Sequence, residues 1–295
     1  MDGQIDLGAV TAGVIDGPDL LRVGSVPPPA EPTATGARRD GNEVRAAAGS
    51  QGEPLERRGA YRGNGRGKQV SSTAAYDQIA DWYEKEFLSG PGAGTAAGNP
   101  RNLGHLLGDL LGAGSGTCLE IGCGTGVHAA QVRDLGWTPV GVDLSSGMLC
   151  HARDRLPIAQ ADASRLPIRD SSVPAAIAVM VHTDMPSYPA ALHEVARVLR
   201  PGGVFVHIGV HPCFCGGFVD RGDPNAVVVR PGYLDGSWTK RSWTNQGVRD
   251  KVGATHLPLS SLLHAFLNAG LTLEQFAEHG APTPVVMAVK ARKAT

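Results

Sequence analysis

The sequence predicts an α/β fold built on a doubly wound, mostly parallel sheet. Three observations indicate it: apolar runs alternate with amphipathic stretches from residue 117 onward, a glycine-rich loop follows the first run, and acidic residues stand at the ends of successive runs. Alternating strands and helices imply right-handed crossovers, and ligands of such sheets bind outside the carboxyl ends of the strands. These ends are therefore the expected site.

Each element follows from its own pattern of apolar residues. Helices are expected over 125–135, 145–155 and 187–200, with Ser145 capping the second and Pro201-Gly202-Gly203 stopping the third. The chain then closes with a helix at 260–268 and an antiparallel strand pair at 271–277 and 285–290. The preceding strands are expected at 118–121, 139–142, 158–161, 175–181 and 204–210.

The first 70 residues differ from the rest of the chain. They hold 13 glycines and 6 prolines and a single aromatic residue, Tyr61. Such a segment buries too little apolar surface to offset its ordering entropy, so we expect a disordered tail over residues 1–70 and an ordered domain over 71–295.

That domain is expected to open with a helix over residues 71–87, capped by Ser71 or Ser72, because Tyr76, Tyr83 and Phe87 fall on one helical face. A second helix is expected at 101–111. The stretch 211–258 is long and irregular and contains Phe214, Tyr233, Trp238 and Trp243.

Composition excludes several classes of function. Lys and Arg number 27 against 28 Asp and Glu, so the net charge of -1 gives no electrostatic footprint for nucleic acid or an anionic membrane. No apolar run reaches the roughly 18 residues of a membrane span, and the N-terminus lacks the basic and apolar regions of a signal peptide. The odd set of five cysteines (118, 123, 150, 213 and 215) indicates reduced thiols in a cytoplasmic protein.

The glycine loop reads T-C-L-E-I-G-C-G-T-G over residues 117–126. A dinucleotide-binding G-x-G-x-x-G pattern that starts at Gly122 needs glycine at 127, where Val127 stands. No Walker lysine follows the loop, which disfavours a nucleoside triphosphate. The glycines at 122, 124 and 126 instead give the spacing G-x-G-x-G, which still indicates a ligand-binding loop.

Four segments carry a resemblance to a known family: E-I-G-C-G-T-G, G-V-D-L-S-S-G-M-L at 141–149, A-D-A-S-R-L-P-I-R-D at 161–170, and L-H-E-V-A-R-V-L-R-P-G-G at 192–203. Together they resemble the class I S-adenosylmethionine-dependent methyltransferases, in the small-molecule branch that includes methyltransferase type 11 and quinone-biosynthesis-like enzymes. The resemblance covers about residues 75–290. It implies a seven-stranded sheet with an antiparallel last strand and S-adenosylmethionine as cofactor.

The resemblance implies roles at the glycine loop. Gly122, Gly124 and Gly126 would let backbone approach the methionine and ribose portion of the cofactor, and Glu120 would support the loop or the cofactor ammonium group. For Glu120, as for the acids below, the alternative is a structural cap or loop hydrogen bond.

Four further residues follow from the same resemblance. Asp143 would accept both ribose hydroxyls, and Leu144 would pack on adenine. Asp162 and Ala163 would meet the adenine amino edge.

A general base is needed only if the acceptor must lose a proton. The candidates follow the fourth and fifth strands: His182, Asp184 and His211. Histidine has a suitable intrinsic pKa, although a loop histidine is more often structural.

A metal site is the competing interpretation for His207, His211, Cys213 and Cys215. Their spacing matches no recognised zinc pattern, so none is predicted. The aromatic residues of 211–258 indicate an insertion or lid on the acceptor side, or else a small satellite core.

The sequence thus predicts methyl transfer from S-adenosylmethionine to a small organic acceptor. One alternative is a catalytically silent S-adenosylmethionine-binding regulatory protein, which would keep the same cofactor residues. The other is a dinucleotide-dependent oxidoreductase, which Val127 disfavours.

Overall fold

The computed structural model describes residues 74–295, except 92, 224–225, 237 and 242–246. The tail expected over residues 1–70, the caps at Ser71 or Ser72 and the aromatic Trp243 lie outside the described residues.

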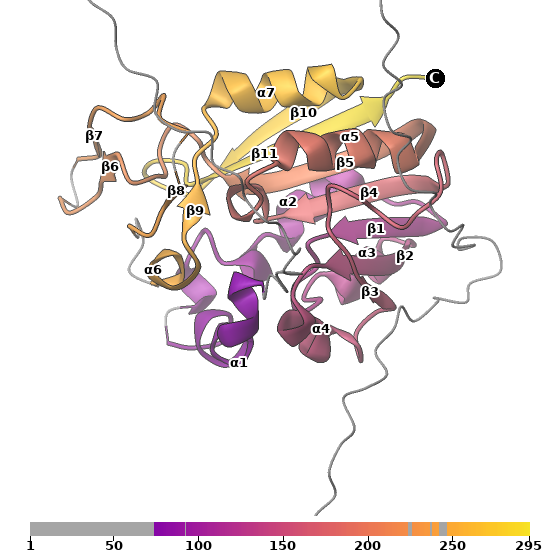
Figure 1. The fold of residues 1–295 in the computed structure, drawn as a ribbon, viewed down its shortest axis with the longest axis horizontal. Coiled ribbons are helices and arrows are strands. Elements are labelled where there is room, and N and C mark those ends of the chain that lie inside the picture. Colours follow the sequence, from indigo (N-terminus) through magenta and orange to yellow (C-terminus); the bar gives the residue numbers. More distant parts are fainter. Residues whose placement is uncertain (1–73, 92, 224–225, 237, 242–246) are drawn as a thin grey trace, which may run out of the picture. The chain divides into compact units, whose positions relative to one another are not determined.

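Seven strands form one mixed sheet, in the order β10-β11-β5-β4-β1-β2-β3 (Figure 1). β1, β2, β3, β4 and β5 run parallel to one another, while β11 runs antiparallel to both β5 and β10. The predicted doubly wound sheet with an antiparallel last strand is confirmed. Its strands are β1 Thr117–Ile121, β2 Thr138–Asp143, β3 Ile158–Gln160, β4 Val173–Val179, β5 Leu199–Val210, β10 Leu271–His279 and β11 Val286–Lys293.

Helices cover both faces of this sheet (Figure 1). On one face, α5 and α7 bury apolar side chains against β1, β4 and β5 in one core cluster, with Leu192, Phe205 and Phe266 among its fully buried members. On the other face, α2 packs on β5 and β11, and α3 and α4 bury a smaller cluster around Cys123. The helices are α2 Gly104–Leu111, α3 Ala129–Asp134, α4 Ser146–Ala152, α5 Tyr188–Val198 and α7 Leu259–Asn268.

The Pro-Gly-Gly segment after α5 differs from its prediction. The helix already ends at Val198, and β5 begins at Leu199 and runs through Pro201. Leu199 pairs with Val173 before the register shifts, so the segment is an irregular start to the strand. Proline and glycine are tolerated at such an irregularity because few ladder bonds are lost there.

The prediction of one regular helix over residues 71–87 is wrong. The chain forms a 3-10 turn at Ala75–Gln78 (η1), one α-helical turn at Ala80–Trp82 (α1) and a π-helical turn at Tyr83–Phe87 (η2). Two further 3-10 turns, Ala93–Thr95 and Pro100–Asn102, lead into α2. The apolar face nevertheless packs as its spacing predicts, because Tyr76, Tyr83 and Phe87 join one cluster with α6.

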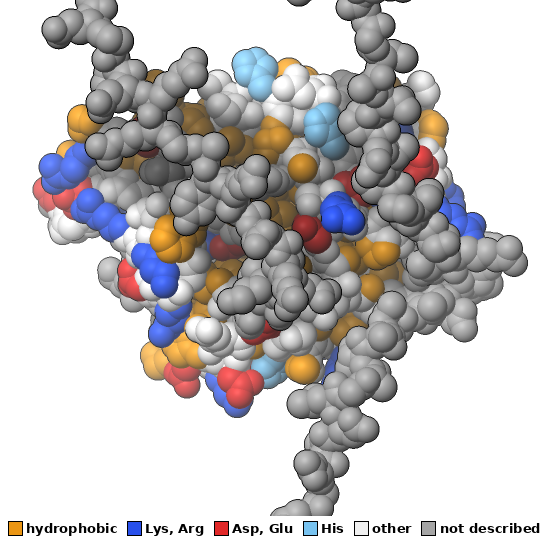
Figure 2. All heavy atoms as spheres, in the orientation of Figure 1, with side chains coloured by type: hydrophobic (Ala, Val, Ile, Leu, Met, Phe, Trp, Pro, Cys, Tyr) orange, Lys and Arg blue, Asp and Glu red, His pale blue; other side chains and the backbone are white. Residues whose placement is uncertain are grey.

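The irregular stretch after β5 contains short elements: β6 Val219–Asp220, β7 Val228–Val229, β8 Trp238–Thr239, α6 Val248–Val252 and β9 Ala254–Thr255. They lie at the side of the sheet where β1 and β4 end (Figure 1). Lys and Arg side chains are visible along this margin in Figure 2. Within the described part of the chain, none of the helices has the length and apolar character of a membrane span.

Candidate active site

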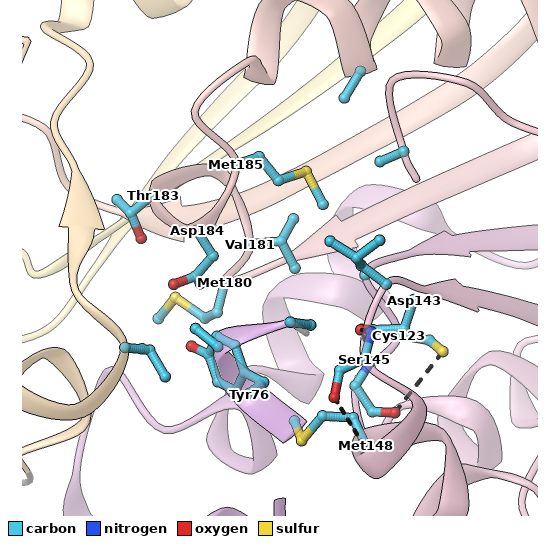
Figure 3. A pocket seen from close by; sticks show the side chains of 18 of the residues that line it. Tyr76, Cys123, Asp143, Ser145, Met148, Met180, Val181, Thr183, Asp184 and Met185 are labelled. Atoms are coloured by element: carbon cyan, nitrogen blue, oxygen red, sulfur yellow. Dashed lines mark hydrogen bonds between the residues drawn. The ribbon is translucent and has the colours of Figure 1, made fainter. Parts of the chain in front are cut away.

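A cavity of about 400 Å³ lies at the carboxyl ends of β1, β2 and β4. Its lining comes from the glycine loop, the ends of these strands, the N-terminal turns and the insertion. Figure 3 shows Cys123, Asp143 and Ser145 on one side of the view, and Tyr76, Met180 and Asp184 on the other. Cavities of this size suit small molecules and cofactors.

The glycine loop takes a conformation that only glycine adopts without strain. Gly122 has φ +64°, and a Cβ there would stand 2.6 Å from Val181 Cγ1. Gly124 has φ +53°, and its amide donates a hydrogen bond of 2.8 Å to Asp143 Oδ2. Gly126 shares the positive φ, at +74°. The loop therefore needs glycines for its own shape as well as for any approach of a ligand.

Asp143 joins the first two strand ends. Its Oδ2 accepts the Gly124 amide, and its Oδ1 accepts the Ser145 amide at 2.8 Å. Burial raises the pKa of Asp143 to about 6, although these two amide bonds oppose the rise. Each carboxylate oxygen can accept more than one hydrogen bond, so the side chain keeps acceptor capacity toward the cavity.

The predicted cap at Ser145 is present, since its Oγ accepts the Met148 amide at 3.1 Å. A second cap comes from the N-terminal turns: Asp77 Oδ1 accepts from Ser145 Oγ at 2.7 Å and from the Gly147 amide at 2.9 Å. Sequence reasoning missed Asp77, because it contacts α4 across about 70 residues. These bonds tie the N-terminal wall of the cavity to the strand end that bears Asp143.

Glu120 is buried on the cavity floor. Its Oε1 accepts from His128 Nδ1 at 2.9 Å, and His128 Nε2 donates to the Pro100 carbonyl at 3.1 Å. Burial lowers the pKa of His128, but the Glu120 carboxylate and the Pro100 carbonyl outweigh this and raise it above the usual value. Glu120 Oε2 has no hydrogen-bond partner among the described residues. A buried, unpartnered carboxylate oxygen beside a cavity suits a cationic ligand group.

The remaining predicted cofactor residues lie along one rim of the same cavity. Leu144 is 49% exposed, which leaves its apolar side chain accessible to a planar ligand group such as adenine. Asp162 is exposed, and its Oδ1 accepts the Ser164 amide at 2.8 Å and the Ser164 hydroxyl at 2.7 Å. Ala163 is buried beside it. The structure brings all eight predicted cofactor residues but Gly126 into the lining, and Gly126 completes the loop's turn.

Asp184 occupies the opposite wall, paired with Arg249 of α6. The side chains of Asp184 and Arg249 are only 17% and 7% exposed. Tyr76 lines the same cavity. Burial raises the pKa of Asp184 above its ordinary value, and the Arg249 guanidinium and the Tyr76 hydroxyl offset part of this rise. Arg249 carries no sequence signal for this role, because 65 residues separate the partners.

The two candidate histidines lie outside the cavity lining. His182 packs against His207, with ring centroids 5.1 Å apart, and burial lowers the pKa of His182 well below its usual value. His211, just after the carboxyl end of β5, instead contacts Glu278 Oε1 through its Nε2 at 2.7 Å. Of the three predicted candidates for a base, the structure brings Asp184 alone to the cavity.

The four residues considered above as a metal site, His207, His211, Cys213 and Cys215, do not form one. His207 Nδ1 bonds the Tyr188 hydroxyl at 2.6 Å, and Cys215 Sγ contacts the Val285 carbonyl at 3.4 Å. Across residues 74–295, apart from the gaps given above, no three His, Cys, Asp or Glu side chains are placed to hold a metal ion.

The aromatic residues of the insertion divide between the two interpretations offered for them. Trp238 lines the cavity, together with Val252 and Thr255. Tyr233 instead packs edge-on against Phe218, with ring centroids 5.5 Å apart, in a satellite cluster under the loop.

Comparison with known proteins agrees with this geometry. Residues 119–207 match the family model described as a methyltransferase domain. A probable phthiotriol/phenolphthiotriol dimycocerosates methyltransferase 2 of Mycobacterium ulcerans is 36% identical over 102 residues, covering 32% of this chain and 40% of that protein. A malonyl-[acyl-carrier protein] O-methyltransferase of Serratia marcescens is 35% identical over 118 residues, covering 38% and 45%. The chain thus spans less than half the length of these curated relatives.

Solved structures share the fold. A S-adenosylmethionine-dependent methyltransferase from Mesorhizobium loti superposes with a TM-score of 0.54 at 23% identity, over 64% of this chain and 96% of that one. The [4+2]-cyclase SpnF gives a TM-score of 0.56 at 20% identity, over 76% and 97%. The sheet order, the glycine loop and the match over residues 119–207 identify a methyltransferase domain in this chain, similar to the class I S-adenosylmethionine-dependent methyltransferases.

Proposed function

We propose that this protein transfers the methyl group of S-adenosylmethionine to a small organic acceptor. One observation carries the proposal: a single cavity joins the glycine loop, Glu120 and Asp143 on one side to Asp184 on the other. The residues proposed to bind the cofactor and the proposed proton acceptor therefore line the same cavity. Activity has to be argued from this site, because one neighbour with the same fold is a [4+2]-cyclase.

The cofactor residues fit the group they would hold. Asp143 would accept the ribose hydroxyls with the lone pairs that the Gly124 and Ser145 amides leave available. Glu120 would use its unpartnered Oε2 for the ammonium group. When bound, S-adenosylmethionine supplies a methyl group on a positively charged sulfur, which is a good leaving group.

The remaining contacts would hold the adenine. Leu144 would cover one face of the ring, and Asp162 and Ala163 would meet its amino edge. This is the assignment made from the sequence, and the shared lining supports it.

Asp184 is the base that this geometry favours over His182 and His211. It lines the cavity, and its raised pKa strengthens it as a proton acceptor. Its carboxylate takes the proton from the acceptor's O–H or N–H group while Arg249 holds it in place. The Tyr76 hydroxyl, like Arg249, favours the ionised form of this carboxylate.

Calorimetry and a turnover assay test the proposal. The full chain is titrated with S-adenosylmethionine, S-adenosylhomocysteine and NAD, and release of S-adenosylhomocysteine is followed with candidate acceptors. We expect micromolar binding of the two sulfur ligands and none of NAD. Binding of NAD alone would contradict the proposal, and cofactor binding with no turnover on any acceptor would favour the silent regulatory protein.

The titration of Asp143 makes cofactor binding pH-dependent. Its pKa of about 6 means that the carboxylate, which accepts hydrogen bonds best, is lost as pH falls through 6. We expect the dissociation constant of S-adenosylhomocysteine to rise several-fold between pH 7.5 and pH 5. An Asp143→Asn variant, which cannot titrate, should bind more weakly at pH 7.5 and show a flatter profile; an equally steep profile would refute the assignment.

We extend the proposal to the chain's organisation. The segment 211–258 is assigned as the acceptor-side lid of a domain over residues 71–295, supported by Trp238, Val252 and Thr255 in the lining. Unpaired cysteines at 118, 123, 150, 213 and 215 favour a cytoplasmic protein, and the net charge of -1 favours a small-molecule acceptor over nucleic acid. The tail expected over residues 1–70 has no part in this assignment.

A further inference from the structure

We infer that the acceptor is a neutral molecule with an apolar body, and that acceptors bearing a carboxylate or phosphate are excluded. This inference rests on the proposed function and names the substrate class of the same site. It follows from the charges that face the cavity, from the side chains of its acceptor wall, and from the engagement of the nearest guanidinium.

The charged side chains of the lining are mostly acidic. Among the described residues, four carboxylates line the cavity and neither lysine nor arginine does. The basic group present is His128, which pairs with Glu120 on the floor. The lining carboxylates are Glu120, Asp143, Asp162 and Asp184. Three of these are assigned to the cofactor, so an anionic acceptor would lose its hydration and meet the Asp184 carboxylate with no lysine or arginine in the described lining to compensate its charge.

Arg249 does not supply that cation. Its guanidinium donates to Asp184 and to the Gly253 carbonyl at 3.3 Å, and it lies behind the wall instead of in the lining. Its side chain is 7% exposed. Arg249 is thus already engaged, and the member of the pair that lines the cavity is the Asp184 carboxylate.

Most of the rest of the acceptor wall is apolar or aromatic, with Thr183 and Thr255 as polar members. Tyr76 and Tyr83 stand edge to face at 5.7 Å, and Met180, Trp238 and Val252 complete the surface around Asp184. Met180 is held with φ +60°, a left-handed conformation that costs energy for a side chain of this kind. Met180 lines the same cavity as Asp184, so its flexible thioether would contact an apolar acceptor.

The view in Figure 2 agrees with this distribution. Lys and Arg side chains are visible mostly at the margins of the face, and a basic group also shows nearer its middle among hydrophobic and acidic side chains. Cationic groups are thus available to an acceptor at the edge of this face but not within the described cavity wall.

The test compares matched neutral and anionic phenols on the full chain. Methyl 4-hydroxybenzoate and 4-hydroxybenzoate form one pair, and 2-naphthol and 6-hydroxy-2-naphthoate form another. Binding to the S-adenosylhomocysteine complex is measured by calorimetry, and release of S-adenosylhomocysteine from S-adenosylmethionine reports turnover. We expect each neutral phenol to bind at least about tenfold more tightly than its carboxylate partner, because like-charge contacts are costly in a desolvated site.

A charge variant sharpens the comparison. Thr255 is half-buried in β9 and lines the cavity, so Thr255→Lys adds a cation to the acceptor wall without opening the core. It should narrow the preference for the neutral partner by at least about tenfold, since the cation offsets the like charges. Thr255→Gln, of similar length and no charge, should leave the preference unchanged.

The outcomes are distinguishable. If S-adenosylhomocysteine binds but the carboxylates bind as tightly as the neutral phenols, or if neither neutral phenol binds the complex, the inference is overturned while the cofactor assignment stands. If S-adenosylhomocysteine itself does not bind, the proposed function fails and the inference fails with it. An unchanged preference in Thr255→Lys would likewise overturn the electrostatic explanation.

Discussion

Replacing Asp143 with alanine is expected to weaken binding of S-adenosylhomocysteine by at least about tenfold, since a hydrogen bond to a charged group contributes about 1.5–3 kcal/mol. The variant loses the ribose acceptor and also the partner of the Gly124 and Ser145 amides. Calorimetry at pH 7.5 measures the effect. The sheet core is untouched, so circular dichroism should report an intact fold.

A ligand that lacks the ribose hydroxyls distinguishes the loss of the ribose acceptor from the loss of the loop's hydrogen-bond partner. The 2′,3′-dideoxy analogue of S-adenosylhomocysteine should bind the wild-type protein more weakly than the parent ligand does. It should bind Asp143→Ala about as well as the parent, because the variant has no carboxylate to use. Asp162→Ala is the matched control, since that exposed side chain is assigned to adenine. Equal losses for both ligands in wild type and variant would show that Asp143 acts on the loop alone.

Replacing Arg249 with methionine is expected to lower the free energy of unfolding by about 3–5 kcal/mol, the usual cost of leaving one buried charge without its partner. Asp184 would remain buried opposite an uncharged side chain. Urea denaturation followed by circular dichroism measures the change. The double variant Asp184→Asn/Arg249→Met should recover much of the loss, because no buried charge is left uncompensated.

An exposed ion pair provides the control. Arg230 and Asp220 approach to 2.7 Å, but their side chains are 56% and 38% exposed. Arg230→Met should therefore cost less than about 1 kcal/mol. If Arg249→Met costs no more than Arg230→Met, the Asp184–Arg249 pair is not the buried structural unit described above.

The parts of the fold that could be predicted are those specified by sequence patterns close to them in the chain. The apolar run before the glycine loop, the capping Ser145 and the periodicity of α5 each lie within about ten residues of what they specify, and all three are confirmed. The N-terminal helix failed because the same apolar spacing is served by a 3-10, an α and a π turn, and periodicity does not distinguish these. The apolar face that these turns share packs against α6.

The same distinction runs through the candidate site. The residues of the glycine loop and the acids at the strand ends could be predicted, because parallel strands bring their carboxyl ends to one edge wherever the chain folds this way. The partners of those residues could not. Asp77 at the start of α4 and Arg249 on Asp184 reach across about 70 and 65 residues.

The sequence by itself therefore determined the sheet and the resemblance to the methyltransferase family, and it predicted the residues of the cofactor cradle, since each depends on short-range order along the chain. Only the tertiary structure decided that Asp184 faces the cavity while His182 and His211 do not. The reason is geometric: residues two apart after a strand can point to opposite sides, and their surroundings come from distant segments. Burial by those segments also raises the pKa of Asp184 and lowers that of His182.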